Sequence, residues 1–93
     1  MQRLTENLIK DNLSRLKGWG LEKDSILKDF ELKNFSDALA FIVKIGIQAE
    51  KMDHHPDLLL HGWNKVKVTL STHSAGGITE NDFNLAKQIE NIS

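Results

Sequence analysis

Apolar and polar residues alternate along the chain with a period that changes from segment to segment, and each period predicts an element. Near the start, Thr5 can cap a helix that runs to Leu16, with apolar residues at the three- and four-residue spacing of one helical face. From residue 19 to residue 32 the period shortens to two, and a polar cluster at residues 22–25 separates two apolar stretches. This region predicts an antiparallel hairpin.

The central segment, residues 38–48, is apolar at nearly every position and predicts a helix capped by Ser36. One small sheet cannot cover a helix that is apolar almost all round, so its second face favours contact with another subunit. Pro56 ends this helix, because proline lacks an amide donor and disfavours helical backbone in the residue before it. His54 and His55 are therefore predicted to lie at the helix end.

The rest of the chain predicts two more strands and a last helix. Residues 58–63 and 65–72 form strands around a short turn, and the alternation along the second strand puts His73 on its outward side. Thr79 and Asp82 resemble a capping box at the start of the last helix. The order α-β-β-α-β-β-α, with two hairpins, predicts an α+β fold in which helices pack on a four-stranded antiparallel sheet.

Composition narrows the class of protein. A chain of 93 residues is expected to form a single domain, residues 1–93. The net charge of −1 gives no positive field for nucleic acid, and the absence of cysteine excludes disulfide scaffolds, thiolate nucleophiles and cysteine-based zinc sites. No apolar stretch approaches the roughly 20 residues that span a bilayer, so we expect a soluble, cytoplasmic protein without membrane contact.

Candidate chemistry is concentrated between residues 54 and 73, which contain all four histidines of the chain: His54, His55, His61 and His73. Imidazole titrates near pH ~6.5, so such a cluster can supply a proton donor and a proton acceptor at neutral pH. Zinc is an alternative, with a carboxylate from Glu50, Asp53 or Asp57 as a further ligand. It is disfavoured because adjacent histidines point in different directions and no histidine pair has the i, i+4 spacing of a helical metal site.

Two other classes of site are weaker alternatives. A Ser-His-Asp triad is open on composition, with Ser71 and Ser74 near His73, but no G-x-S-x-G elbow is present. Gly76 and Gly77 precede a predicted helix without a following Lys-Ser/Thr or a G-x-G-x-x-G pattern. They therefore predict a turn and not a phosphate-binding loop.

Several spacings agree at once with a known family. The residues concerned, separated by gaps of three, six, nine and eight residues, are Glu50, the His54-His55-Pro56 triplet, Trp63, His73 and Asp82. The runs Trp63-Asn64-Lys65-Val66 and Gly77-Ile78-Thr79 add to the pattern. The sequence resembles the pterin-4a-carbinolamine dehydratase family over almost the whole chain.

This resemblance implies a hydro-lyase that dehydrates the 4a-hydroxytetrahydropterin left by an aromatic amino acid hydroxylase, giving quinonoid dihydropterin without metal or organic cofactor. It implies that His54 and His73 transfer protons and that His55 binds and orients the pterin. A hydroxyl leaves poorly unless it is protonated, and the cationic ring must then lose a proton, so the reaction needs both an acid and a base. The resemblance also implies a homodimer or homotetramer.

Three more residues are candidates for binding or orienting the substrate. Glu50 shares a helical face with His54 and is expected to set its tautomer, and Asp82 is expected to cap the last helix and to orient His73. Trp63 is expected to form a flat wall for the pterin ring. Each residue also has a purely structural interpretation: Glu50 as an exposed helix residue, Asp82 as a helix cap and Trp63 as a core or hairpin aromatic. His61 matches no position of the family and stays out of the predicted site.

A second class of function stays open. Animal members of the family also act as dimerisation cofactors of a homeodomain transcription factor, which implies that the apolar helix at residues 38–47 is a protein-binding surface. No residue in this sequence identifies such a partner.

Overall fold

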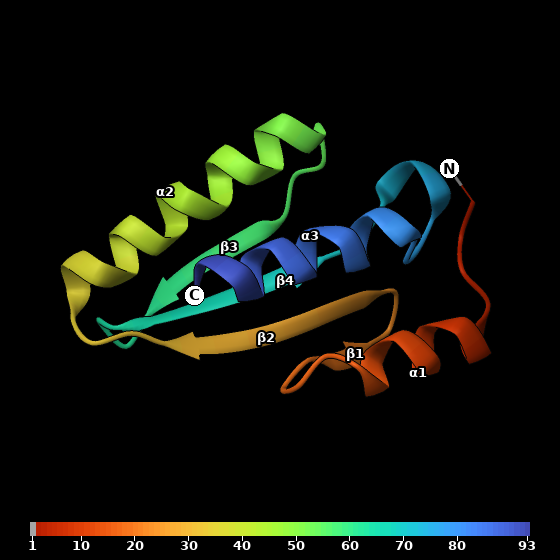
Figure 1. The fold of residues 1–93 in the computed structure, drawn as a ribbon, viewed down its shortest axis with the longest axis horizontal. Helices are drawn as coiled ribbons and strands as arrows, with labels where there is room; N and C mark the ends of the chain where they lie inside the picture. The colour runs from red at the N-terminus through yellow and green to blue at the C-terminus, as the bar shows by residue number, and fades with distance from the viewer. Residues whose placement is uncertain (1) are drawn as a thin grey trace.

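The computed structural model describes residues 2–93, and it has the predicted α-β-β-α-β-β-α order with one added 3₁₀ turn (Figure 1). The elements are α1 (Glu6–Ser14), β1 (Gly20–Glu22), β2 (Ser25–Glu31), α2 (Phe35–Met52), β3 (Asp57–His61), β4 (Lys65–Leu70), the 3₁₀ turn η1 (His73–Ala75) and α3 (Glu80–Ile92). The α+β class and the four-stranded antiparallel sheet predicted from the sequence are confirmed.

The four strands lie in the order β1-β2-β4-β3, and every neighbouring pair is antiparallel. The two hairpins are β1–β2 and β3–β4, as predicted, and β4 pairs with a strand of each hairpin. Helix α2 therefore connects β2 to the far edge of the sheet. The β3–β4 turn has three residues, Gly62, Trp63 and Asn64, and the first two have positive φ. The strand predicted to reach Trp63 accordingly ends at His61.

One face of the sheet is covered by helices. Val66, Val68 and Leu70 of β4 are fully buried beneath them, and the alternating residues of the same strand, including Lys67 and Thr69, face the other side. Figure 1 shows α2 and α3 side by side over the sheet, and α3 contributes its buried residues, Phe83, Leu85, Ala86 and Ile89, to the same core. The alternation predicted for β4 is confirmed.

Helix α2 begins earlier than predicted and has a different cap. Its N-cap is Asn34, whose Oδ1 accepts a hydrogen bond from the backbone N–H of Asp37 at 2.8 Å. Ser36, the predicted cap, lies inside the first turn and donates its hydroxyl to Asn34 Oδ1 at 2.9 Å. Asn34 is favoured because its extended backbone and short amide side chain suit the capping position.

The apolar surface of α2 divides into two faces. Ala38, Phe41, Ile45 and Ala49 are buried against the sheet and α3. Four other side chains recur every four residues and are 46–60% exposed; we call them the outer stripe, and they are Phe35, Leu39, Val43 and Ile47. Within one chain, therefore, the helix buries a single face, and the expected second contact of α2 stays a prediction.

None of the helices within residues 2–93 combines the length and the apolarity needed to cross a bilayer.

Candidate functional site

The helix α2 ends at Met52, before the predicted stop at Pro56, and this end directs the two adjacent histidines. Asp53 adopts the left-handed conformation (φ 50°), and its N–H and that of His54 turn back onto the last carbonyls of the helix, including Ala49 O at 3.0 Å from His54 N. His54 and His55 thus lie just beyond the helix, in the link to β3. Pro56 begins the extended chain that leads into the strand.

His54 is buried and paired with a buried carboxylate. It is 8% exposed, and its Nε2 lies 2.6 Å from Oδ1 of Asp82, which is 0% exposed. The other carboxylate oxygen, Oδ2, accepts hydrogen bonds from the Thr72 hydroxyl and from the backbone N–H of Thr79, both at 2.9 Å. The bond from Thr79 N–H belongs to the predicted capping box, which is present. Asp82 therefore joins the start of α3 to the end of α2.

His55 is exposed and paired with a different carboxylate. Its side chain is 62% exposed, and its Nε2 lies 2.9 Å from Oε1 of Glu50, which is 80% exposed. Two predicted partnerships are therefore wrong: Glu50 contacts His55 and not His54, while Asp82 contacts His54 and not His73. The left-handed turn at Asp53 explains the exchange, because it takes His54 off the helical face that Glu50 occupies.

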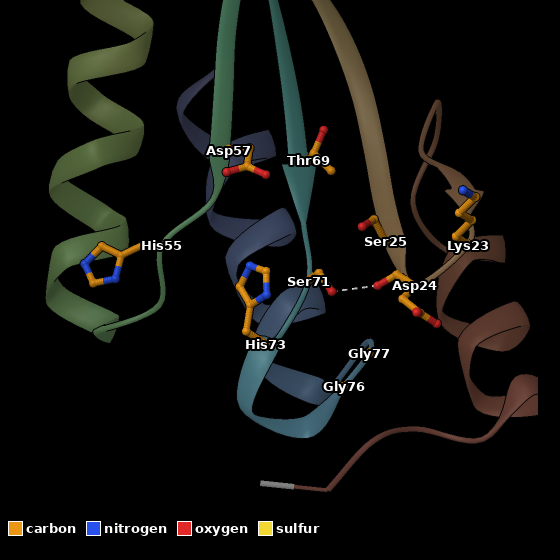
Figure 2. Close-up of a pocket in the computed structure, with 10 residues that line it drawn as sticks. All are labelled: Lys23, Asp24, Ser25, His55, Asp57, Thr69, Ser71, His73, Gly76 and Gly77. Atoms are coloured by element: carbon orange, nitrogen blue, oxygen red, sulfur yellow. Dashed lines mark hydrogen bonds between the residues drawn. The ribbon is translucent and has the colours of Figure 1, made fainter.

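His73 begins the 3₁₀ turn η1 and is not part of β4. The strand ends at Leu70, and Thr72 then forms an isolated bridge with Gly77 that closes the loop between them. The predicted outward side of His73 is confirmed, because His73 lines the same cleft as Thr69 and Ser71, but the loop and not the strand holds it there. In Figure 2 its ring extends from the loop toward Asp57 at the start of β3.

A cleft of about 360 Å³ brings these segments together (Figure 2). It is lined by Lys23, Asp24, Ser25, His55, Asp57, Thr69, Ser71, His73, Gly76 and Gly77. A smaller adjoining hollow of about 220 Å³ shares His55, Ser71 and His73 with it and adds His54. The three histidines chosen from the sequence therefore line one continuous depression, to which the loops at residues 53–55 and 71–74 both contribute.

The opposite wall of the cleft comes from a turn that the sequence predicted but did not assign to the site. Lys23 and Asp24 form the β1–β2 turn, and Ser25 begins β2. The Ser71 hydroxyl donates to the carbonyl oxygen of Asp24 at 2.7 Å, shown as the dashed line in Figure 2. This bond fixes the turn against the end of β4. The sequence could not assign this turn to the site, because its place beside His73 depends on the β2–β4 pairing.

Trp63 and His61 lie at the other end of the β3–β4 hairpin. Trp63 is 62% exposed in the turn, whereas the cleft is lined by Asp57 and Thr69, which pair at the opposite end of the same two strands. Within one chain, the wall expected from Trp63 is therefore absent from the cleft. His61 contacts Asp29 Oδ1 at 2.8 Å across the sheet, which agrees with its exclusion from the predicted site.

The arrangement suits proton transfer between groups of unequal burial. One imidazole is held by a buried carboxylate, and two others are exposed beside a cleft whose wall includes Lys23, Asp24 and Asp57. An imidazole can serve as a proton donor or as a proton acceptor in catalysis. Within residues 2–93, no three side chains of histidine, aspartate or glutamate gather closely enough to hold a metal ion.

Comparison with known proteins places this fold and cleft in a family. Residues 2–92 match the family model described as pterin 4 alpha carbinolamine dehydratase. A relative from Sulfolobus acidocaldarius, named by inference as a pterin-4-alpha-carbinolamine dehydratase, is 48% identical over 97% of this chain and 98% of its own. A similarly named relative from Sulfurisphaera tokodaii is 44% identical over 99% and 98%.

A solved structure from Brucella melitensis, described as a transcriptional coactivator/pterin dehydratase, superposes with a TM-score of 0.92 at 39% identity and covers 98% of both chains. A pterin dehydratase-like protein described as a RuBisCO assembly factor shares the fold alone, with a TM-score of 0.64 at 19% identity. The family resemblance inferred from the histidine spacing is thus confirmed. The chain belongs to the pterin-4-alpha-carbinolamine dehydratase family, and its activity is that of a dehydratase.

Proposed function

We propose that the protein removes water from a 4a-hydroxytetrahydropterin by histidine acid–base catalysis and so supports the recycling of tetrahydrobiopterin. The observation that carries this proposal is the buried pair of His54 and Asp82 beside a cleft that His55 and His73 also line. The family's name supplies the pterin substrate class. An aromatic amino acid hydroxylase, acting with this enzyme in the cytoplasm, would generate the substrate.

The reaction needs two proton transfers and no redox step. A protonated imidazole gives its proton to the 4a-hydroxyl group, the bond between carbon 4a and oxygen breaks, and water leaves. The resulting cationic ring then gives a ring-nitrogen proton to a neutral imidazole, which yields quinonoid dihydropterin. The substrate has lost one molecule of water, and the two imidazoles together have neither gained nor lost a proton.

The contacts of each histidine suggest its role. Asp82 accepts from Nε2 of His54, which leaves Nδ1 of that ring as the nitrogen able to exchange a proton with a ligand. No hydrogen bond to another side chain occupies the ring of His73 among the described residues, so it is suited to the second proton transfer. His55, which Glu50 holds at the rim, is suited to binding and orienting the pterin.

The test is the rate of quinonoid dihydropterin formation from freshly generated 4a-hydroxytetrahydropterin, measured above the spontaneous rate with and without EDTA. We expect acceleration that persists in EDTA. The variants His54→Ala and His73→Ala are each expected to lower kcat by about 100-fold or more, the range typical of general acid–base groups.

His61→Ala serves as the matched control, because His61 is a partly exposed histidine on the β3–β4 hairpin and lies outside the cleft. It is expected to keep wild-type kcat. Loss of activity in EDTA would point to a bound metal, and full activity in the double variant of His54 and His73 with an unchanged circular dichroism spectrum would refute the proposed mechanism.

A second candidate function, protein binding through α2, is favoured by the outer stripe alone. Those four apolar side chains form one continuous row on the helix and are about half exposed. Burying such a row against a second copy would remove it from water, and this supports a homodimer or homotetramer. The Brucella protein is described as a coactivator as well as a dehydratase, so a partner other than a second copy is the competing occupant of this surface.

A further inference from the structure

A chain of hydrogen bonds beneath the cleft runs through two threonines that the catalytic proposal leaves without a role. The Thr72 hydroxyl lies 2.9 Å from Asp82 Oδ2 and 2.8 Å from the Thr79 hydroxyl. Thr72 is 8% exposed and Thr79 is 0% exposed. The two hydroxyls are thus as buried as the His54–Asp82 pair that they adjoin.

The direction of each bond in this chain follows from donor and acceptor counting. An ionised carboxylate can only accept, so the Thr72 hydroxyl donates its single proton to Asp82. Thr72 can then only accept from Thr79, whose hydroxyl donates at 2.8 Å. With Oδ2 of Asp82 occupied by Thr72 and by the Thr79 N–H, Oδ1 is left for His54.

Thr72 also fixes the position of His73, the other proton-transferring histidine. Thr72 N–H donates to Gly77 O at 2.9 Å, and Gly77 N–H donates back to Thr72 O at 3.3 Å. These two bonds close the loop that begins with His73. Thr72 therefore holds His73 through its backbone and the partner of His54 through its side chain.

We propose that Thr72 is a positioning residue for the dehydration: its hydroxyl keeps Asp82 oriented so that His54 stays protonated at Nε2 and presents Nδ1 to the substrate. This inference rests on the proposed function for its catalytic consequence. Valine at this position would keep the shape, would leave Oδ2 with one donor in place of two, and would leave the Thr79 hydroxyl without its acceptor. Asp82 would then keep only the Thr79 N–H and His54 as partners, so its orientation and the tautomer of His54 would be held less firmly.

The experiment compares Thr72→Val with Thr72→Ser, which keeps the hydroxyl. Long-range ¹H–¹⁵N NMR correlations report which ring nitrogen of His54 carries the proton, and steady-state assays at the same pH report kcat and KM. We expect Thr72→Ser to retain the Nε2–H tautomer and to stay within about twofold of the wild-type kcat. Thr72→Val is expected to show mixed tautomers and a kcat lower by about tenfold or more, with KM little changed, as for loss of one hydrogen bond to a charged group.

Val66→Ala is the matched control for lost stability, because Val66 is buried on β4 away from the cleft. It should destabilise the fold and leave both the tautomer and kcat as in the wild type. If Thr72→Val does not fold, Thr72→Cys replaces it, since a thiol is a weak donor of similar size, and the expected effects lie between those of serine and valine.

A Thr72→Val protein with the wild-type tautomer and kcat would overturn the inference, as would equal loss of activity in Thr72→Ser. The NMR result does not depend on turnover. If the wild-type protein failed to dehydrate the pterin, the proposed function would fall, and the tautomer comparison would still decide whether Thr72 orients His54 through Asp82.

Discussion

Two carboxylate–histidine pairs flank the cleft, and the burial of each pair determines how much the protein loses when the pair is broken. The pair of His54 and Asp82 is enclosed, and the two side-chain groups that hold Asp82 from outside its own helix turn are His54 and Thr72. The pair of His55 and Glu50 is open to water on both sides. Hydrogen bonds to a buried charge are costly to leave unmade, whereas exposed ion pairs contribute little. Similar distances in the two pairs therefore predict different consequences of mutation.

We predict that Asp82→Asn lowers both stability and activity. The amide keeps one acceptor oxygen but turns an NH₂ group toward groups that donate to Asp82, namely Thr72, the Thr79 N–H or His54. A donor facing a buried donor costs about 1–3 kcal/mol, which urea denaturation would measure. Glu80→Gln, an exposed change in the same first turn of α3, is expected to alter stability by less than about 0.5 kcal/mol. Wild-type stability and kcat in Asp82→Asn would contradict the role assigned to this carboxylate.

For the exposed pair of His55 and Glu50 we predict that mutation has little effect on stability or activity. Glu50→Gln keeps a side-chain oxygen for His55 and removes a charge that solvent already screens. The free energy of unfolding should change by less than about 0.5 kcal/mol, and kcat should stay within about twofold of the wild-type value, the rate equivalent of the same energy. Denaturation and the dehydration assay on the same preparation would check both. A loss of activity as large as that of Asp82→Asn would show that Glu50 takes part in the reaction.

The residues of the site could be chosen from the sequence, but their partners could not. The spacings selected His54, His55 and His73, and all three line the same depression. Helical periodicity placed Glu50 on the same helical face as His54, because it assumes that the helix continues through residue 54. The left-handed turn at Asp53 breaks that assumption, and a backbone conformation at one residue leaves no mark in the apolar pattern.

At the scale of elements, the C-terminal end of α2 matters most for the site, because His54 and His55 follow directly after the helix ends. Period-two alternation predicted β4 correctly, since this strand buries one face and leaves the other partly exposed, and both predicted hairpins are present. The boundaries of α2 were less predictable. Asn34 and Ser36 are both good capping residues, and only the position of the first helical turn decides between them.

We predict that Asn34→Ala destabilises the protein by about 1 kcal/mol, because the backbone N–H of Asp37 loses its side-chain acceptor. Ser36→Ala is expected to cost less, since it removes only the bond that supports the cap from within the first turn. Urea denaturation of the two variants would order them. Equal costs, or a larger cost for Ser36→Ala, would mean that Ser36 is the cap in solution.

At the scale of the whole molecule, the sheet and helices of one chain bury a single face of α2 and leave the outer stripe in water. We predict that the protein associates through this stripe and that Val43→Glu weakens the association by at least about tenfold, because the new charge would have to be buried between copies. Light scattering across a dilution series would measure the mass. Leu8→Glu, a change at a leucine of similar exposure on α1, is the matched control and should keep the wild-type mass.

The activity of the Val43→Glu protein separates two roles for the assembly. The three histidines and the β1–β2 turn that line the depression, and the Asp82 that holds His54, come from one chain, so a dissociated protein should keep its kcat. Loss of kcat together with loss of mass would mean that a second copy completes the site, and Trp63 would then be the side chain to examine, because it is exposed and absent from the cleft of its own chain. A wild-type protein that is monomeric at every concentration would remove self-association as the reason for the apolar stripe and leave a different partner as its occupant.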